Sequence, residues 1–216
     1  MNLYFISGLG ADKRMFQKLV LPESFSIHYI DYLPVLKDES LDDYCRRLSE
    51  QIDLRQPFSL VGLSFGGVIS VEMSKFLSPV QTVLISSFYL QKEVPWFYVF
   101  LSKTGLYKML PAKIMLKPCN FLFRFFGAYN PATKNLLKHI LQDTDPTFFR
   151  WALMKLFSWD NEWKPENLLR IHGTADRVLP YKTNMNAIAV EGGEHLMVYS
   201  KSEIVSEILT QNLELA

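Results

Sequence analysis

The sequence has few cysteines and no long apolar run. Its 216 residues include only Cys45 and Cys119, and a chain of this length buries enough surface to fold without disulfides, so both are expected to be reduced thiols. The apolar stretches are broken at Lys103, Arg124 and Pro131, short of the roughly 18 residues that a membrane-spanning helix needs. We therefore expect no transmembrane segment.

The chain also lacks the charge and targeting signals of several protein classes. Its formal net charge is +1 without a long basic run, so nothing indicates nucleic-acid binding. The first residues carry no basic segment followed by an apolar one, which favours a cytoplasmic location. No dinucleotide fingerprint, Walker sequence or metal-ligand cluster occurs. We expect a small-molecule partner with no cofactor and no metal, and the sequence leaves the oligomeric state open.

Apolar runs that end in Gly, Ser or Asp alternate with helical patterns in both terminal parts of the chain. Such runs are typical of strands buried on both faces of a parallel sheet. Six strands are expected, at residues 2–6, 26–30, 58–63, 80–85, 168–172 and 187–190. Helices are expected at 12–20, at 41–52 after a capping Ser40, after Gly67 to about residue 77, and near 202–213. This is the pattern of an α/β protein with a mostly parallel sheet.

Residues 91–163 interrupt this alternation. They hold 16 of the 30 aromatic residues, and ten Lys and Arg against five Asp and Glu, and prolines divide them into short helical pieces. We interpret them as a helical cap inserted into a core of residues 1–90 and 164–216. Trp96 and Phe97 are expected to line a substrate pocket under this cap, with cations at its mouth that attract an anionic substrate. A layer of core helices without a binding role is the alternative.

Residues 62–66 read Gly-Leu-Ser-Phe-Gly, the pattern in which a serine occupies a strained turn between a strand and a helix. The glycines are needed because side chains two positions before and after that serine would collide with the crossing helix and strand. An apolar strand precedes the pattern and a helical segment follows it. Ser64 is therefore the candidate nucleophile.

A serine hydroxyl is a weak nucleophile and needs a general base, a task that suits histidine. Of the four histidines, His195 is the candidate, because it lies in a glycine-rich loop after the last expected strand. His28 is expected to be buried in mid-strand with a structural role. His139 lies within the cap, and His172 ends a strand.

The base needs a carboxylate on its far nitrogen. Asp176 follows the strand at 168–172. The chain order Ser64, Asp176, His195 is the order of nucleophile, acid and base that accompanies this serine pattern. A turn cap is the alternative role for Asp176. Asp31, which also follows a strand, is the second choice.

Acyl transfer also needs two donors for the oxyanion. One is expected to be the backbone N–H of Phe65, directly after the nucleophile. The other is assigned to Leu9 in the loop after the first strand, with Gly10 as the competing choice. Gly8 and Gly10 let this loop fold back toward the serine, and we expect both to border the substrate.

The elbow at 62–66, the acid loop at 172–176 and the base loop at 193–195 resemble the signatures of the α/β-hydrolase superfamily. The resemblance spans nearly the whole chain. It implies an α/β-hydrolase fold with a reduced sheet of about six strands, starting at the equivalent of the family's third strand, and a cap after the equivalent of its sixth. The chain departs from the pattern at Ser7-Gly8, where His-Gly is usual, and in the 18 residues between Asp176 and His195, which leave room for little more than a short helix and a strand.

The resemblance implies a serine hydrolase of carboxylesterase or thioesterase type that acts through an acyl-enzyme. A cofactor-free lyase or C–C hydrolase with the same three residues is one alternative, and a non-catalytic receptor for a small ligand is another. The epoxide-hydrolase and dehalogenase branches are not expected, because Ser64 replaces their aspartate. Glu72 and the other helix acids are expected on solvated faces.

Overall fold

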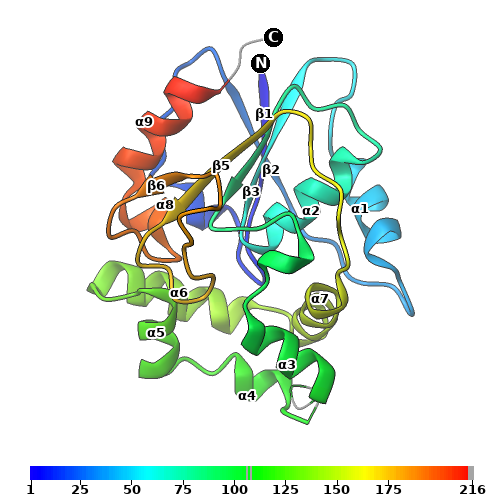
Figure 1. Ribbon diagram of the computed structural model, residues 1–216, viewed down its shortest axis with the longest axis vertical. Helices are drawn as coiled ribbons and strands as arrows, with labels where there is room; N and C mark the ends of the chain where they lie inside the picture. The colour runs from blue at the N-terminus through cyan, green and yellow to red at the C-terminus, as the bar shows by residue number, and fades with distance from the viewer. Residues whose placement is uncertain (106, 108, 214–216) are drawn as a thin grey trace.

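The centre of the molecule is a six-stranded sheet in which all neighbouring strands are parallel (Figure 1). The structure is a computed structural model that describes residues 1–105, 107 and 109–213. The strand order is β2-β1-β3-β4-β5-β6. The strands are β1 (Asn2–Ile6), β2 (Ser26–Ile30), β3 (Phe58–Leu63), β4 (Thr82–Ile85), β5 (Leu168–Gly173) and β6 (Ile188–Val190). The predicted α/β fold with about six parallel strands is confirmed.

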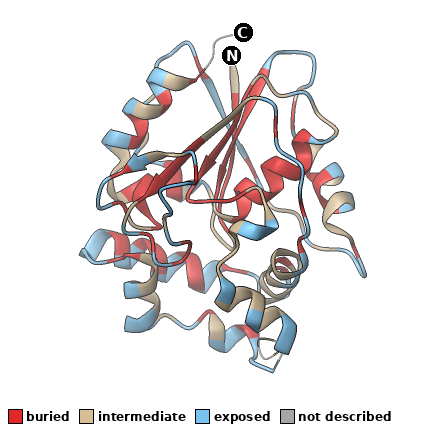
Figure 2. Ribbon diagram, in the orientation of Figure 1, coloured by how far each residue is buried: buried red, intermediate tan, exposed pale blue. Residues whose placement is uncertain are grey.

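Alternate residues of the strands enter two apolar cores, one on each face of the sheet. Leu3 and Phe5 of β1 face the core formed with η1 (Lys13–Phe16), α8 (Met197–Ser200) and α9 (Ser202–Asn212). Tyr4 and Ile6 face the other core, which is covered by α1 (Leu41–Ser49) and α2 (Phe65–Ser74). Figure 2 shows buried residues along the central strands and on the adjoining faces of these helices. Because the strands are parallel, the loops that follow them all lie on one side of the sheet, at the carboxyl ends of the strands.

The edge strand β2 corrects the expectation for His28. Ser26 to Tyr29 are exposed and only Ile30 is buried, because an edge strand leaves these side chains open to solvent. His28 is exposed and stacks on Tyr4, with ring centroids 4.8 Å apart. The prediction of a buried His28 is wrong.

Some expected helices are shorter than their sequence patterns suggest. The segment at 12–20 contains only the four-residue 3₁₀ helix η1, whose N-cap is Asp12. The helix after Ser40 ends at Ser49, and the Ser40 Oγ accepts a hydrogen bond from the Asp43 N–H at 3.0 Å, as a capping serine does. Between Asp176 and His195 there is a loop and β6, without a helix.

Residues 91–163, here called the helical segment, join β4 to β5 and lie at the carboxyl ends of the strands (Figure 1). The helical segment contains η2 (Gln91–Glu93), α3 (Trp96–Thr104), α4 (Ala112–Met115), α5 (Asn120–Phe126), α6 (Pro131–Asp143) and α7 (Pro146–Ser158). Prolines mark where the helices begin: Pro95 and Pro111 directly precede α3 and α4, and Pro131 and Pro146 open α6 and α7. Proline is favoured there because the first helical N–H has no intrahelical partner.

Two tryptophans attach the helical segment to the core. The Trp151 Nε1–H donates to the Glu39 carbonyl oxygen at 3.1 Å, and the Trp159 Nε1–H donates to Glu72 Oε1 at 2.6 Å. Glu72 is buried and also accepts a hydrogen bond from Lys75 Nζ at 2.5 Å. The prediction that Glu72 lies on a solvated face is wrong, because Trp159, distant in sequence, covers this side of α2 and supplies a donor.

Two further sequence expectations concern membranes and thiols. Among the described residues, no helix combines the length and the apolar character needed to cross a bilayer. Cys45 is buried and Cys119 is exposed, and both are free thiols, as predicted.

Candidate active site

Ser64 occupies a strained turn between β3 and α2. Its backbone lies at φ 53° and ψ −118°, a conformation that non-glycine residues rarely adopt. A Cβ atom on Gly62 would overlap the carbonyl oxygen of Gly66, and one on Gly66 would overlap the carbonyl oxygen of Ile6. Both glycines are therefore required by this close crossing of strand and helix.

Hydrogen bonds from the neighbouring strand hold Ser64 in this conformation. The Ser64 N–H donates to the Ile85 carbonyl oxygen at 2.9 Å, and the Ser87 Oγ–H donates to the Ser64 carbonyl oxygen at 2.7 Å. The strained backbone is thus stabilised by its surroundings, and the hydroxyl is left to face the space above the sheet.

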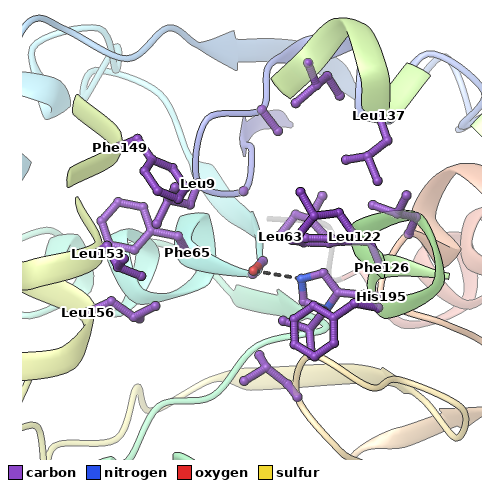
Figure 3. Close-up of a pocket in the computed structure, with 18 of the residues that line it drawn as sticks. Leu9, Leu63, Phe65, Leu122, Phe126, Leu137, Phe149, Leu153, Leu156 and His195 are labelled. Atoms are coloured by element: carbon purple, nitrogen blue, oxygen red, sulfur yellow. Dashed lines mark hydrogen bonds between the residues drawn. The ribbon is translucent and has the colours of Figure 1, made fainter. Parts of the chain in front are cut away.

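Ser64, His195 and Asp176 form one hydrogen-bonded chain. His195 Nε2 lies 3.0 Å from Ser64 Oγ (Figure 3), and His195 Nδ1 lies 2.8 Å from Asp176 Oδ2. The acid and base loops are joined by a bond from the Ala175 N–H to the Gly193 carbonyl oxygen at 2.9 Å. The structure therefore brings together the three residues that the sequence singles out.

Asp176 has two structural tasks, one for each carboxylate oxygen. Oδ1 accepts the N–H groups of Val178 and Leu179, each at 2.9 Å, and so caps the turn, while Oδ2 faces His195. Burial alone would raise the pKa of Asp176, but the adjacent His195 and these hydrogen bonds outweigh it, so the pKa lies below its ordinary value. The carboxylate is charged and fixed in orientation.

His172 is a second buried histidine in this region. Its Nε2 lies 2.7 Å from the Leu179 carbonyl oxygen and 3.6 Å from Asp176 Oδ2, and burial lowers its pKa. It supports the turn that carries Asp176. The sequence analysis missed this role, although the four-residue spacing from His172 to Asp176 was a usable signal. The remaining candidates, His139 and Asp31, are exposed, and neither joins the hydrogen-bonded chain.

The loop after β1 passes directly beside Ser64. A Cβ atom on Gly8 would lie 3.4 Å from the Ser64 Cβ. Leu9 lines the same cavity as Ser64, whereas Gly10 borders a separate surface depression. Within the described part of the chain, no acceptor pairs with the backbone N–H of Leu9 or of Phe65.

Three hydroxyl groups fix the conformation of that loop. Ser7 Oγ–H donates to the Ala11 carbonyl oxygen at 2.6 Å, and Tyr32 O–H donates to the Ser7 carbonyl oxygen at 2.6 Å. Thr144, between α6 and α7, places its Oγ1 2.6 Å from the Ile140 carbonyl oxygen and 2.9 Å from the Gly10 carbonyl oxygen, so its one O–H is shared between the two. Neither Tyr32 nor Thr144 could be recognised from the sequence, because both reach the loop from distant segments.

A cavity of about 240 Å³ extends from Ser64 and His195 under the helical segment. The described residues that line it are apolar, apart from Ser64, His195 and Tyr98, and none of them is a lysine, arginine, aspartate or glutamate. No described residue forms a hydrogen bond with the Tyr98 hydroxyl, and burial raises the pKa of Tyr98, so it is a neutral donor. The full lining comprises Gly8, Leu9, Ala11, Met15, Leu63, Ser64, Phe65, Phe88, Val94, Tyr98, Met115, Leu122, Phe125, Phe126, Leu137, Ile140, Leu141, Phe149, Leu153, Leu156, Phe157, Val178, Leu179, His195 and Leu196.

The lining corrects three expectations for the substrate pocket. Trp96 is 78% exposed and does not border the cavity, and neither does Phe97. Tyr98 is the lining residue from α3, because this turn of the helix directs Tyr98 inward. Gly10 is also outside the lining, and none of the described lysine and arginine residues borders this cavity.

The cavity has two sides relative to the nucleophile. In Figure 3, Phe149, Leu153 and Leu156 of α7 lie on the side of Phe65 and Leu9, whereas Leu122, Phe126 and Leu137 lie toward His195. The Phe126 ring meets the His195 ring edge to face, with centroids 5.7 Å apart. We call these regions the α7 side and the His195 side.

Solved structures with closely similar backbones include two esterases and a bromoperoxidase. A thermophilic esterase from Thermogutta terrifontis is 13% identical, with a TM-score of 0.71 over 98% of this chain and 88% of that one. An esterase from Exiguobacterium antarcticum is 17% identical, with a TM-score of 0.68 over 98% and 91%. A bromoperoxidase from Bacillus anthracis is 15% identical, with a TM-score of 0.70 over 98% and 91%.

No protein-family model matches the sequence, and no curated protein matches it. The structural likeness and the all-parallel sheet together establish the class of the molecule: the chain has the α/β-hydrolase fold.

Proposed function

We propose that the protein is a serine hydrolase that cleaves a small, apolar acyl ester or thioester. The observation that carries this proposal is the hydrogen-bonded chain from Ser64 through His195 to Asp176, which ends in an apolar cavity. The two esterases among the structural neighbours support a hydrolase.

In the proposed reaction, His195 donates its Nδ1–H to Asp176, which leaves Nε2 to accept the proton of Ser64. The Ser64 Oγ attacks the carbonyl carbon of the substrate, and His195 passes the proton to the departing alcohol or thiol. This gives an acyl-enzyme on Ser64. Water then attacks the acyl carbon with His195 as base, and the carboxylic acid and the free serine are released.

The negative charge that develops on the carbonyl oxygen needs hydrogen-bond donors that are already in place. We assign this role to the backbone N–H groups of Leu9 and Phe65. Support comes from their lack of a partner in the described chain, from their place beside Ser64, and from the hydroxyl groups that fix the loop carrying Leu9.

The two sides of the cavity suggest how the substrate lies. The leaving group must be within reach of His195 Nε2, so we place it on the His195 side. The acyl chain then occupies the α7 side, against Phe149, Leu153 and Leu156. In this arrangement the helical segment acts as a cap that covers the acyl chain and excludes water from it.

A fluorophosphonate probe tests the nucleophile. It is expected to label the wild-type protein on Ser64 and to leave Ser64→Ala unlabelled. Asp176→Asn is expected to keep the fold and to lower kcat by about 10⁴, the scale seen when such a carboxylate is lost. A folded wild-type protein that the probe does not label would refute the proposal.

Steady-state turnover separates this proposal from a receptor and from a lyase. Short-chain acyl esters and thioesters are supplied in large excess over the protein, and the released alcohol or thiol is measured. Many equivalents of alcohol or thiol per protein support the hydrolase. Release that stops at one equivalent, with the acyl group retained on Ser64, indicates a ligand-binding protein. Absence of release from a protein whose Ser64 the probe labels directs the search to C–C or elimination substrates.

A further inference from the structure

The helical segment presents a second apolar surface, on the side away from the cavity. Trp96 and Phe100 of α3, Met109 and Leu110 before α4, Ile114 of α4 and Phe121 of α5 are all exposed, and we call these six residues the outer apolar face. Trp96 is 78% exposed, Ile114 60% and Phe121 70%. The helices α3, α4 and α5 lie at the end of the molecule away from both chain termini (Figure 1), and exposed apolar side chains at one end of a molecule are candidates for a surface used in association.

The same helices are apolar toward the cavity as well. Tyr98 of α3, Met115 of α4 and Leu122 of α5 line the cavity, next to the outward-facing Phe100, Ile114 and Phe121. Burying the inner residues therefore does not explain the outer ones. A helix with apolar residues on two sides needs apolar surroundings on both.

The charge of this region has one sign. Residues 94–142 contain seven Lys and Arg and no Asp or Glu, whereas the whole chain has 23 and 22. Of these seven, Lys103, Lys113, Lys117, Arg124, Lys134 and Lys138 lie in the described chain, and all six are exposed. None of the six takes part in a salt bridge there.

We infer that the outer apolar face docks on the surface of an anionic phospholipid bilayer. Helices that lie in the bilayer interface combine Trp, Phe and Leu with Lys and Arg that face anionic head groups. The exposed residues of α3, α4 and α5 have this composition, and the absence of Asp and Glu removes the repulsion that such a surface would cause.

Vesicle co-sedimentation with the full chain tests the inference. The protein is expected to bind phosphatidylcholine vesicles that contain phosphatidylglycerol, to bind pure phosphatidylcholine weakly, and to be released by high salt. The charge variant Lys113→Gln/Lys117→Gln should weaken binding about 25-fold, or about fivefold for each cation. The apolar variant Trp96→Ser/Ile114→Ser should weaken it at least about tenfold, at any salt concentration.

Two single-site controls lie away from the outer apolar face. Ile204→Ser removes an exposed apolar side chain from α9. Arg55→Gln removes an exposed cation, paired with Asp53, from the loop before β3, at the amino-terminal ends of the strands. Both should bind like the wild type, and all variants should keep the wild-type Tm. The inference is overturned if anionic vesicles do not bind the protein, or if the controls lose binding equally. It is also overturned if the chain dimerises in solution and Trp96→Ser/Ile114→Ser makes it monomeric, because the face then belongs to a second copy.

Discussion

Replacing Leu153 by Phe should shorten the acyl chain that the protein prefers. Leu153 lines the α7 side of the cavity, where we place the acyl chain, and Phe has about three more side-chain carbons than Leu. The three carbons that Phe adds take the place of about three carbons of the acyl chain, so the optimum should be about three carbons shorter in Leu153→Phe than in the wild type.

The energy of burying methylene groups gives the size of the effect. Each buried CH₂ contributes about 0.8 kcal/mol, so kcat/KM should rise about fourfold per carbon up to the optimum. Three carbons that no longer fit cost about 2.4 kcal/mol, so Leu153→Phe should lose roughly sixtyfold on the ester that the wild type prefers. The esters of two carbons should be hydrolysed at similar rates by both proteins.

The assay measures acid release from ethyl esters of increasing chain length. Leu137→Phe is the matched control, because Leu137 lies on the His195 side and should restrict the alcohol but not the acyl chain. An unchanged acyl optimum in Leu153→Phe would refute our placement of the acyl chain. A shorter acyl optimum in Leu137→Phe alone would reverse the assignment of the two sides.

Three more predictions follow from polar groups near the site. Tyr98→Phe removes a hydroxyl that no described residue pairs with, so esters with a hydroxyl or keto group on the acyl chain should lose about fivefold in kcat/KM while unsubstituted esters are unaffected. Equal losses on both would contradict a role in recognition. Thr144→Val removes the hydroxyl that is shared between the Gly10 and Ile140 carbonyl oxygens, and should lower kcat about fivefold with little change in KM. A change in KM alone would mean that the loop binds substrate without stabilising the oxyanion. Because burial lowers the pKa of His172, the unfolded chain takes up a proton near pH 6.5 that the folded chain does not, so wild-type stability should fall below about pH 6.5. In urea unfolding, His172→Gln should flatten that dependence, whereas the lowered pKa of Asp176 acts only below about pH 3.8.

The sheet was predictable from the sequence because parallel strands are apolar runs that end where the chain must turn. β3, for example, runs from Phe58 to Leu63 and ends at the serine turn, as expected. The edge position of β2 was not predictable. Residues 26–30 have the composition of a buried strand, and only the order of the strands shows that β2 has a single neighbour and that His28 is exposed.

The meeting of Ser64, Asp176 and His195 was also predictable, because each residue follows a strand and all strands end at one edge. The surroundings of these residues were not. Four of the first five residues of α3 are aromatic, so the sequence does not indicate whether Trp96 or Tyr98 faces the cavity. A glutamate on a helix is normally solvated. The burial of Glu72 depends on a hydrogen bond from Trp159, which directly follows α7 and is distant from Glu72 in the sequence.

The connection between the helical segment and the sheet limits how this molecule is able to diversify. The loops that follow the strands contribute the reacting groups and α3 to α7 contribute about half of the cavity wall, so exchanging these helices is a direct route to a new substrate range. The exchange is not free, however. Thr144 contacts the loop beside Ser64 through its hydroxyl. Trp159 donates a hydrogen bond to the buried carboxylate of Glu72 on α2, the helix that follows Ser64. A grafted set of helices without the hydroxyl of Thr144 and the indole of Trp159 would change the substrate specificity. It would also loosen the loop beside Ser64 and leave Glu72 without its indole donor.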